Sequence, residues 1–181
     1  MEKETRLKNL KEGKIGNLEQ VSLIVDELKK EGKRIAYVEG VFDLCLLGHK
    51  ELVDFAKEQG DVVVVGVASD EYAATKGPDR PVFTIDQRAE LISAFGKVDF
   101  VITLENPPSK PGSQEADEYL NKITNRLRPD VIVASTTTDT NPEAKRIRAE
   151  LCGAKFVPQN DERPTAYSST KVIQKALELL S

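Results

Sequence analysis

One continuous apolar run constrains the fold of this chain more than any other feature. Residues 61–67 read Asp-Val-Val-Val-Val-Gly-Val, without the alternation of apolar and polar side chains that a half-exposed strand shows. The run therefore predicts a strand that is buried on both faces, as in a parallel sheet covered by helices on each side. This assignment requires strands and helices to alternate along the rest of the chain.

The rest of the sequence does alternate in this way. Hydrophobic spacing and glycine or proline boundaries predict five strands, at residues 34–40, 61–67, 98–104, 130–134 and 154–158. Helices are predicted at residues 17–31, 48–59, 70–75, 84–95, 115–127, 142–151 and 168–180, with Thr84 as an N-cap. The pattern indicates a single doubly wound, parallel five-stranded α/β sheet with helices on both faces. Ligands in such sheets bind beyond the carboxyl ends of the strands.

Length and composition fit one domain and argue against several classes of protein. The 181 residues predict a single domain over residues 1–181, whose lysine- and glutamate-rich residues 1–15 form a flexible arm. Asp and Glu outnumber Lys and Arg by 30 to 26, which argues against binding to nucleic acid or a membrane surface. No apolar run suits a membrane span or a signal core, so we expect a cytoplasmic protein. Two cysteines and one histidine, without CxxC spacing, argue against a disulfide framework or a zinc site.

Common fingerprints of nucleotide and hydrolase sites are missing from the sequence. There is no G-x-G-x-x-G after the first predicted strand, which disfavours a dinucleotide oxidoreductase, and no G-x-x-x-x-G-K motif, which excludes a P-loop enzyme. No G-x-S-x-G nucleophile motif is present either. A ligand site in this sheet must therefore use other residues.

The segment after the first predicted strand is suited to an anion. The strand ends at Gly40, which lets a ligand approach the backbone closely. Gly48-His49 then opens a helix, whose free N–H groups and positive end attract phosphate. His49 can donate a hydrogen bond to a phosphate oxygen, although a lone histidine at this place can also be an ordinary surface residue. Residues 168–170 (Ser-Ser-Thr) start the last helix, where a hydroxyl can cap the helix or bind an anion.

Residues 40–49 (GVFDLCLLGH) resemble the signature of the cytidylyltransferase-like nucleotidyltransferases, in which a glycine and Phe-Asp precede His-x-Gly-His. Residues 66–71, 76–82, 87–91 and 167–173 resemble further motifs of that family in the same order. The pattern is most similar to the nucleotidyltransferase domain of ADP-heptose synthases and covers about residues 15–173. The resemblance implies a Rossmann-like domain of the HIGH nucleotidyltransferase type.

The resemblance also implies a reaction, its substrates and a set of site residues. A nucleotidyl group would pass from ATP or CTP, with ATP favoured, to a sugar phosphate or related small phosphate, with release of pyrophosphate. Mg²⁺ would arrive with the nucleotide rather than in a protein cage, and a homodimer is compatible with the family. Catalytic roles would fall to His49, Lys76 and Arg88, and nucleotide or phosphate binding to Gly40, Val41, Phe42, Asp43, Gly48, His49, Ser168, Ser169 and Thr170.

Two of these assignments depend on the resemblance alone. Lys76 can equally be read as a solvated loop lysine. Arg88 stands among the charges of a helix, so its pattern predicts an exposed surface arginine.

Departures from the family pattern keep a second hypothesis open. Leu46 replaces the first histidine of the pair and has no hydrogen-bond donor for a phosphate in transfer. Losing one such donor costs about 2.7–4 kcal/mol of transition-state stabilisation, or roughly 10²–10³ in rate. Residues 134–141 (ASTTTDTN) replace a glycine-rich loop, and Glu39 adds negative charge beside the expected phosphate site. The alternative is a catalytically weakened or inactive nucleotide-binding module that acts as a sensor or partner subunit.

Overall fold

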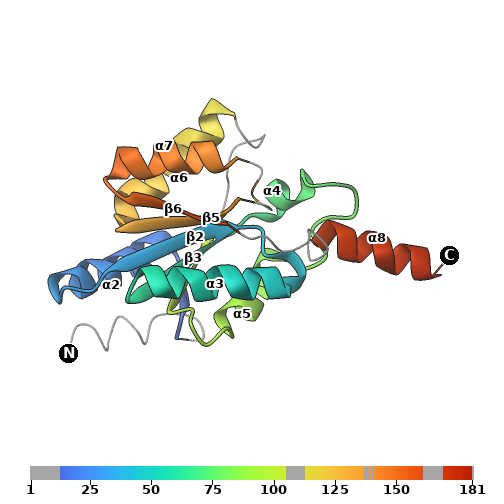
Figure 1. Cartoon of the computed structure of the whole chain (residues 1–181), viewed down its shortest axis with the longest axis horizontal. Helices are drawn as coiled ribbons and strands as arrows, with labels where there is room; N and C mark the ends of the chain where they lie inside the picture. Colours follow the sequence, from blue (N-terminus) through green and yellow to red (C-terminus); the bar gives the residue numbers. More distant parts are fainter. Residues whose placement is uncertain (1–12, 105–112, 137–138, 140, 161–168, 181) are drawn as a thin grey trace.

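A six-stranded parallel sheet forms the centre of the computed structural model, which describes residues 13–104, 113–136, 139, 141–160 and 169–180 (Figure 1). The strands are β1 (Ile15–Gly16), β2 (Ile35–Gly40), β3 (Val62–Ala68), β4 (Phe100–Leu104), β5 (Val131–Ser135) and β6 (Lys155–Gln159). They lie in the order β1-β4-β3-β2-β5-β6, and every pairing is parallel. The predicted doubly wound α/β fold is confirmed.

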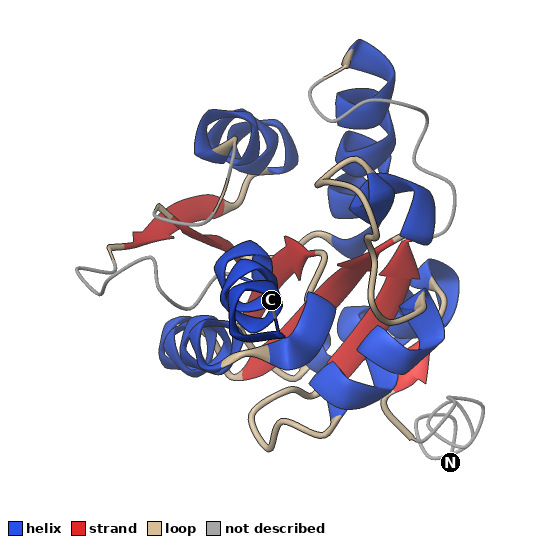
Figure 2. Cartoon of the chain, turned by 90° about the vertical axis from the view of Figure 1, so that its right-hand side faces the viewer, coloured by secondary structure: helices blue, strands red, loops and turns tan. Residues whose placement is uncertain are grey.

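Helices cover both faces of this sheet (Figure 2). The helices are α2 (Leu18–Lys30), α3 (Leu47–Gln59), α4 (Asp70–Ala74), α5 (Ile85–Ser93), α6 (Gln114–Leu127), α7 (Pro142–Cys152) and α8 (Ser169–Leu180), with a short 3₁₀ turn η1 (Asp43–Cys45) before α3. Residues of α2, α6 and α7 share one apolar core with one face of the sheet, and residues of α3 and α5 share another with the opposite face. Within the described residues, no helix is long and apolar enough to cross a bilayer.

Residues 62–67 of the run that predicted a doubly covered strand lie in β3, and all residues of β3 are buried. Its successive side chains enter the two cores in turn, since Val62 and Val64 belong to the α2 side while Val63 and Val65 belong to the α3 side. Period-two alternation between two apolar layers explains why the run shows no polar positions. Thr84 caps α5 as predicted, because its hydroxyl accepts the Gln87 backbone N–H.

The sequence pattern missed the sixth strand. Ile15 and Gly16 form β1, which pairs with Val101 and Ile102 at the edge of the sheet. A strand of two residues is too short to show a period, and Ile15 follows a run of charged residues. Ile15, the last residue of the arm expected over residues 1–15, therefore belongs to the sheet, where it is only 5% exposed. Residues 1–12 lie outside the described part of the chain.

The strand order fixes where a ligand can bind. The chain proceeds from β2 outward through β3 and β4, and then returns to the other side of β2 to form β5 and β6. The order therefore reverses between β2 and β5, and ligands of doubly wound sheets bind in the crevice beyond the carboxyl ends at such a point. The turn η1, α4 and the start of α8 lie at this edge of the sheet (Figure 1).

Candidate functional site

The β2–α3 loop (residues 41–46) leaves the carboxyl end of β2 in a strained backbone conformation. Phe42, Leu44 and Cys45 have φ angles of 54°, 65° and 41°, in the left-handed region that residues other than glycine seldom occupy. Such positions cost on the order of 1–3 kcal/mol each and persist only where their surroundings hold them. They concentrate at functional sites, so the strain supports the predicted location of the site.

Asp43 holds this loop to two distant segments. Its side chain is buried, and its carboxylate accepts the backbone N–H groups of Val82 and Phe83 at 3.0 and 3.2 Å. The same carboxylate pairs with Arg80 Nε at 2.7 Å. The Asp43 carbonyl accepts the hydroxyl of Ser169 at 2.6 Å, which brings the start of α8 to the loop. These contacts favour a positioning role for the Asp43 side chain, and direct phosphate binding by Asp43 stays a prediction.

The structure corrects the predicted exposure of Arg88, which is completely buried. Its Nε donates to the Phe83 carbonyl at 2.9 Å, its Nη1 to the Val41 carbonyl at 2.6 Å, and its Nη2 to the Asp70 carboxylate at 2.6 Å. The face of α5 that carries Arg88 points into the loop region. There Arg88 supplies hydrogen-bond donors to backbone carbonyls that would otherwise be buried without a partner. Direct phosphate binding by Arg88 stays a prediction, and these contacts instead favour a positioning role.

His49 lies in the first turn of α3 and caps that helix. The Leu46 backbone N–H donates to His49 Nδ1 at 3.0 Å, so Nδ1 carries no proton. Burial lowers the pKa of His49 to about 4, Asp43 opposes this shift and Arg80 reinforces it. The imidazole is therefore neutral at physiological pH, with its proton on Nε2. The ring also meets Phe42 edge-on, with 5.4 Å between the ring centroids.

Lowering the pH from 6.5 to 4 should destabilise the protein through His49. The folded pKa is about 4, while an unfolded histidine titrates near 6.5. The unfolded state thus binds more protons between these two values, and the folded state loses about 3 kcal/mol of stability across this window.

Since His49 is the only histidine in the chain, one imidazole resonance in an NMR titration reports its pKa directly. We expect no titration above pH 5. Chemical unfolding at several pH values should show the stability loss in the native protein and a smaller loss in His49→Gln. A midpoint near 6.5 would contradict the neutral, capping histidine.

Leu46 preserves the backbone of the helix start although its side chain lacks a donor. It is half-buried, and its carbonyl accepts the N–H groups of His49 and Lys50 at 2.9 and 3.3 Å. These bonds do not depend on the side chain. The Leu46 side chain therefore offers a ligand no hydrogen-bond donor, while the position of His49 is held by the backbone.

The opposite face of β2 carries a buried ion pair. Glu39 is 8% exposed, and its carboxylate pairs with the buried Arg148 of α7. Lys145 of the same helix donates to the Glu39 carbonyl at 3.0 Å and pairs with Asp139 at 2.5 Å. The negative charge of Glu39, beside the predicted phosphate site, is therefore compensated by α7.

Lys76 lies beyond the end of α4, at the same edge of the sheet. Its Nζ is 5.5 Å from the centre of the Tyr72 ring, and the residue is half-buried rather than fully solvated. Burial lowers the pKa of Lys76, Asp139 opposes this shift and Lys145 reinforces it. Lys76, Asp139 and Lys145 thus share one electrostatic environment near the carboxyl ends of β2 and β5.

The remaining predicted residues are placed in part. Gly40 ends β2, Val41 begins the loop, and Gly48 lies in the first turn of α3 beside His49. Ser169 is buried against Asp43. Ser168 and the side chain of Thr170 lie outside the described residues. The β2–α3 loop and the start of α8 therefore meet at this edge, although more than a hundred residues separate them.

Sequence reasoning missed the contributions of α7. Lys145, Arg148 and Cys152 recur at spacings of three and four, the spacing of a buried helix stripe. Charged residues in such a stripe look like surface residues until an acidic partner is known. Glu39, a carboxylate at the end of an otherwise buried strand, was the signal that could have identified them.

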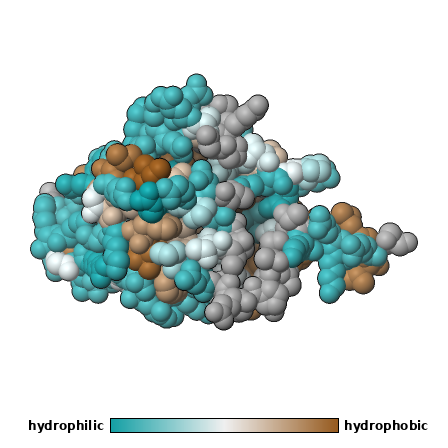
Figure 3. Space-filling view, turned by 45° about the horizontal axis from the view of Figure 1, so that its top comes forward, coloured by the Kyte–Doolittle hydropathy of each residue, from teal (hydrophilic) through white to brown (hydrophobic). Residues whose placement is uncertain are grey.

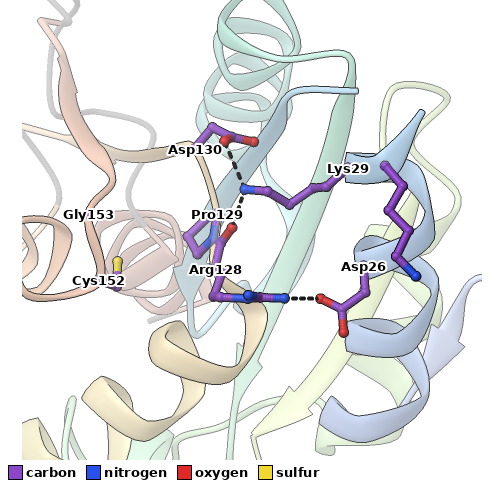
Figure 4. A pocket seen from close by; sticks show the side chains of 8 residues that line it. Asp26, Lys29, Arg128, Pro129, Asp130, Cys152 and Gly153 are labelled. Atoms are coloured by element: carbon purple, nitrogen blue, oxygen red, sulfur yellow. Dashed lines mark hydrogen bonds and ion pairs between the residues drawn. The ribbon is translucent and has the colours of Figure 1, made fainter. Parts of the chain in front are cut away.

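A hollow of about 720 Å³ lies at the opposite edge of the sheet (Figure 4). Its charged groups already satisfy one another, since Lys29 donates to Asp130 and to the Arg128 carbonyl, while Arg128 pairs with Asp26. The full lining consists of Asp26, Lys29, Lys30, Arg128, Pro129, Asp130, Cys152 and Gly153. This edge holds the amino ends of the strands, where doubly wound sheets do not place their ligands. We assign it no function.

Comparison with known proteins places the chain in a family. The model of the cytidylyltransferase-like family matches residues 37–175. Proteins called bifunctional protein HldE are similar in part: that of a Nitratiruptor species is 38% identical over 120 residues, 66% of this chain and 24% of that protein. The counterpart from Sulfurimonas denitrificans is 32% identical over 127 residues, 70% of this chain and 24% of that protein. The chain thus spans about a quarter of the length of these curated relatives.

A solved structure is similar as well. The lipopolysaccharide core biosynthesis protein from Thermoplasma volcanium superimposes with a TM-score of 0.57 and 26% sequence identity. The match covers 73% of this chain and 100% of that one.

Proposed function

Because the chain belongs to the cytidylyltransferase-like family, we propose that it transfers a nucleotidyl group from a nucleoside triphosphate to a small sugar phosphate and releases pyrophosphate. One observation carries this proposal: a neutral His49, fixed by its own helix start, keeps a proton on Nε2 at the carboxyl edge of the sheet. ATP is the favoured nucleotide. The names of the similar proteins, HldE and a lipopolysaccharide core biosynthesis protein, support a sugar-linked acceptor.

The proposed reaction is an in-line displacement at the α-phosphorus. A phosphate oxygen of the acceptor forms the new bond to the α-phosphorus, and the bond to the bridging β-phosphate oxygen breaks as pyrophosphate leaves. Catalysis of this kind is mostly charge stabilisation. His49 Nε2–H would donate to an α-phosphate oxygen, and the free N–H groups in the first turn of α3 would add to that stabilisation. Mg²⁺ would enter with the nucleotide as part of the substrate.

The residues on the two faces of β2 suggest where each of the two substrates binds at the carboxyl edge of the sheet. His49, the β2–α3 loop and the start of α8 lie together and suit the nucleotide phosphates. Lys76 and Lys145 lie near Asp139 beyond β2 and β5, and suit an anionic, hydroxyl-rich acceptor. Carboxylate and ammonium groups together can accept from and donate to hydroxyls, as recognition of a sugar phosphate requires.

Calorimetric titration with ATP and with CTP, each in the presence of Mg²⁺, tests the nucleotide half of this proposal. We expect saturable binding of ATP that is tighter than that of CTP. The Lys30→Ala variant, altered at the opposite hollow, should bind as the native protein does. Absence of binding by both nucleotides would overturn the proposal.

Leu46 is the specific observation that favours the second candidate, a nucleotide-binding module with little or no catalysis. Pyrophosphate release with ATP and a panel of sugar phosphates separates the two candidates. Turnover by the native protein that Leu46→His reduces identifies an adapted enzyme. Turnover that appears only in Leu46→His identifies a binding module.

A further inference from the structure

Lys145 and Asp139 form an ion pair at the carboxyl end of β2, on the side of the sheet that α6 and α7 cover. Lys145 Nζ is 2.5 Å from Asp139 Oδ2, and the two side chains are only 12% and 14% exposed. Both residues lie outside the sequence motifs that resemble the cytidylyltransferase-like family. Figure 3, in which this side of the molecule comes forward, shows a mostly hydrophilic surface. The pair is therefore a candidate for binding a polar ligand.

Asp139 is held in place by two hydrogen bonds that leave its Oδ2 facing Lys145. Its backbone N–H donates to the Ser135 carbonyl at 3.3 Å, and its Oδ1 accepts the Asn141 backbone N–H at 2.9 Å. Burial alone would raise the pKa of Asp139, but the charge of Lys145 lowers this pKa below its usual value. The carboxylate is therefore ionised at neutral pH. Since a carboxylate oxygen accepts from more than one donor, Oδ2 can accept from a ligand hydroxyl and stay paired with Lys145.

Lys145 keeps one hydrogen-bond donor for a ligand. Of the three N–H groups of its ammonium, one donates to the Glu39 carbonyl at 3.0 Å and one faces Asp139. Among the residues that the structure describes, the third N–H has no acceptor. A nearly buried donor gains more from an acceptor than an exposed one does, because fewer water molecules reach it. An anionic oxygen is the acceptor that an ammonium favours most.

Lys76 supplies a second positive charge near Lys145. It lies just beyond α4, with its Nζ 5.5 Å from the centre of the Tyr72 ring. Burial lowers the pKa of Lys76, and the charges of Lys145 and Arg80 lower it further. Burial and the charge of Arg80 also lower the pKa of His49. Because Arg80 acts on both groups, the two lysines are near the proposed nucleotide site.

We propose that Lys145 and Lys76 bind the phosphate of the acceptor and that Asp139 accepts a hydrogen bond from a hydroxyl on the carbon next to the phosphate ester. This inference rests on the proposed function, and it narrows the acceptor to phosphate esters with such a neighbouring hydroxyl. Because Lys145 Nζ and Asp139 Oδ2 are in contact, a phosphate bound to the ammonium brings only its nearest groups to the carboxylate. A hydroxyl farther along the molecule would not reach Oδ2.

The charges of these three side chains explain why the hydroxyl matters. Two ammonium groups attract a phosphate, whereas the Asp139 carboxylate repels it. A phosphate ester without the hydroxyl meets this repulsion and gains nothing from Asp139. An ester with the hydroxyl gains a hydrogen bond to a charged group, which is worth roughly 10–100-fold in affinity. Asp139 is thus the residue that determines specificity, and Lys145 provides affinity.

NMR titration of the full chain with hydroxyethyl phosphate and with ethyl phosphate tests the site without nucleotide or turnover. The two esters differ only in the neighbouring hydroxyl. We expect the native protein to bind hydroxyethyl phosphate, and to bind ethyl phosphate about 10–100-fold more weakly. Equal affinities for the two esters, or no binding of either, would overturn the inference.

The variant Lys145→Met tests the source of affinity. It should weaken the binding of hydroxyethyl phosphate by about tenfold or more, and the binding of ATP much less. Arg146→Met is the matched control, because Arg146 is the next residue of α7 but lies 45% exposed on its solvent side. It should bind both esters as the native protein does. If Lys145→Met weakens ATP as much as the ester, the lysines hold nucleotide phosphates and the inference is wrong.

The variant Asp139→Ala tests the source of specificity. It removes a repelling charge, so ethyl phosphate should bind several-fold more tightly than to the native protein. It also removes the acceptor, so the preference for hydroxyethyl phosphate should disappear. Glu143→Ala, which removes a 63% exposed carboxylate in the first turn of α7, should change neither affinity. A gain in affinity cannot come from a damaged fold, and a preference that survives in Asp139→Ala would rule out the role of Asp139.

The proposed function and this inference can fail separately. ATP binding without a preference between the two esters would overturn the inference alone. A preference that Asp139→Ala abolishes, in a protein that binds neither ATP nor CTP, would overturn the proposed function and leave a phosphate-ester site at Lys145.

Discussion

Replacing His49 by alanine should lower kcat/KM for nucleotidyl transfer by roughly 10²–10³, the usual effect of removing one donor from a transition-state oxyanion. Two separate functions are lost in that variant. The imidazole can no longer donate from Nε2, and Leu46 N–H loses its acceptor at the start of α3. The second loss removes a helix cap and costs about 0.5–2 kcal/mol of stability.

Glutamine at the same position separates the two functions. In α2 and α5, Gln20 and Gln87 occupy the equivalent third position, and their side-chain oxygens accept the N–H of Asn17 and Thr84 at 3.0 Å. His49→Gln should therefore keep the cap and the stability of the native protein but still lose turnover. Initial-rate kinetics and chemical unfolding measure the two effects. A His49→Gln variant with native turnover would show that the imidazole acts only as a cap.

Replacing Arg148 by methionine should destabilise the fold by about 3–5 kcal/mol, because it leaves the Glu39 carboxylate buried without its partner. Both side chains are nearly inaccessible, at 3% exposure for Arg148 and 7% for Glu39. The double variant Glu39→Leu/Arg148→Met removes both charges and should recover most of the loss, since apolar replacements of a whole buried pair are often neutral.

Arg146 provides the control on the same helix. It pairs with Glu143 and Glu150 on the solvent side of α7, where it is 45% exposed. Arg146→Met should cost less than about 1 kcal/mol, as for most surface ion pairs. Urea unfolding of the four proteins gives the comparison. If Arg148→Met costs no more than Arg146→Met, the buried pair does not hold α7 to β2.

The sheet could be predicted because its strands β2 to β5 are largely buried and its strands are bounded by glycine, proline and charged residues. Each predicted helix or strand boundary lies within two residues of the structure. The strand β1 could not be predicted, since two residues carry no period and its stabilisation comes from Val101, a residue 86 positions away from Ile15.

The location of the candidate site could be predicted from local signals, but the hydrogen bonds that hold the site together could not. Gly40 and His49 lie in one short segment, so their spacing and the helix start can be read directly. The burial of Arg88 depends on carbonyls of Val41 and Phe83 that become neighbours only in the folded chain. The sequence pattern of a charged residue on a helix is the same whether its side chain faces solvent or buried backbone carbonyls.

The contacts of Asp43 have a consequence for the order in which the chain is made. A growing chain emerges from the ribosome from its N-terminus, so the Asp43 carboxylate is synthesised well before residues 80–83 and long before Ser169, which follows it by 126 positions. Until these residues have been synthesised, the β2–α3 loop lacks the hydrogen bonds that Asp43 forms with Val82, Phe83 and Ser169. The segments that form the site are thus joined only after Ser169 has emerged, whereas β2 and β3 can pair as soon as both have emerged.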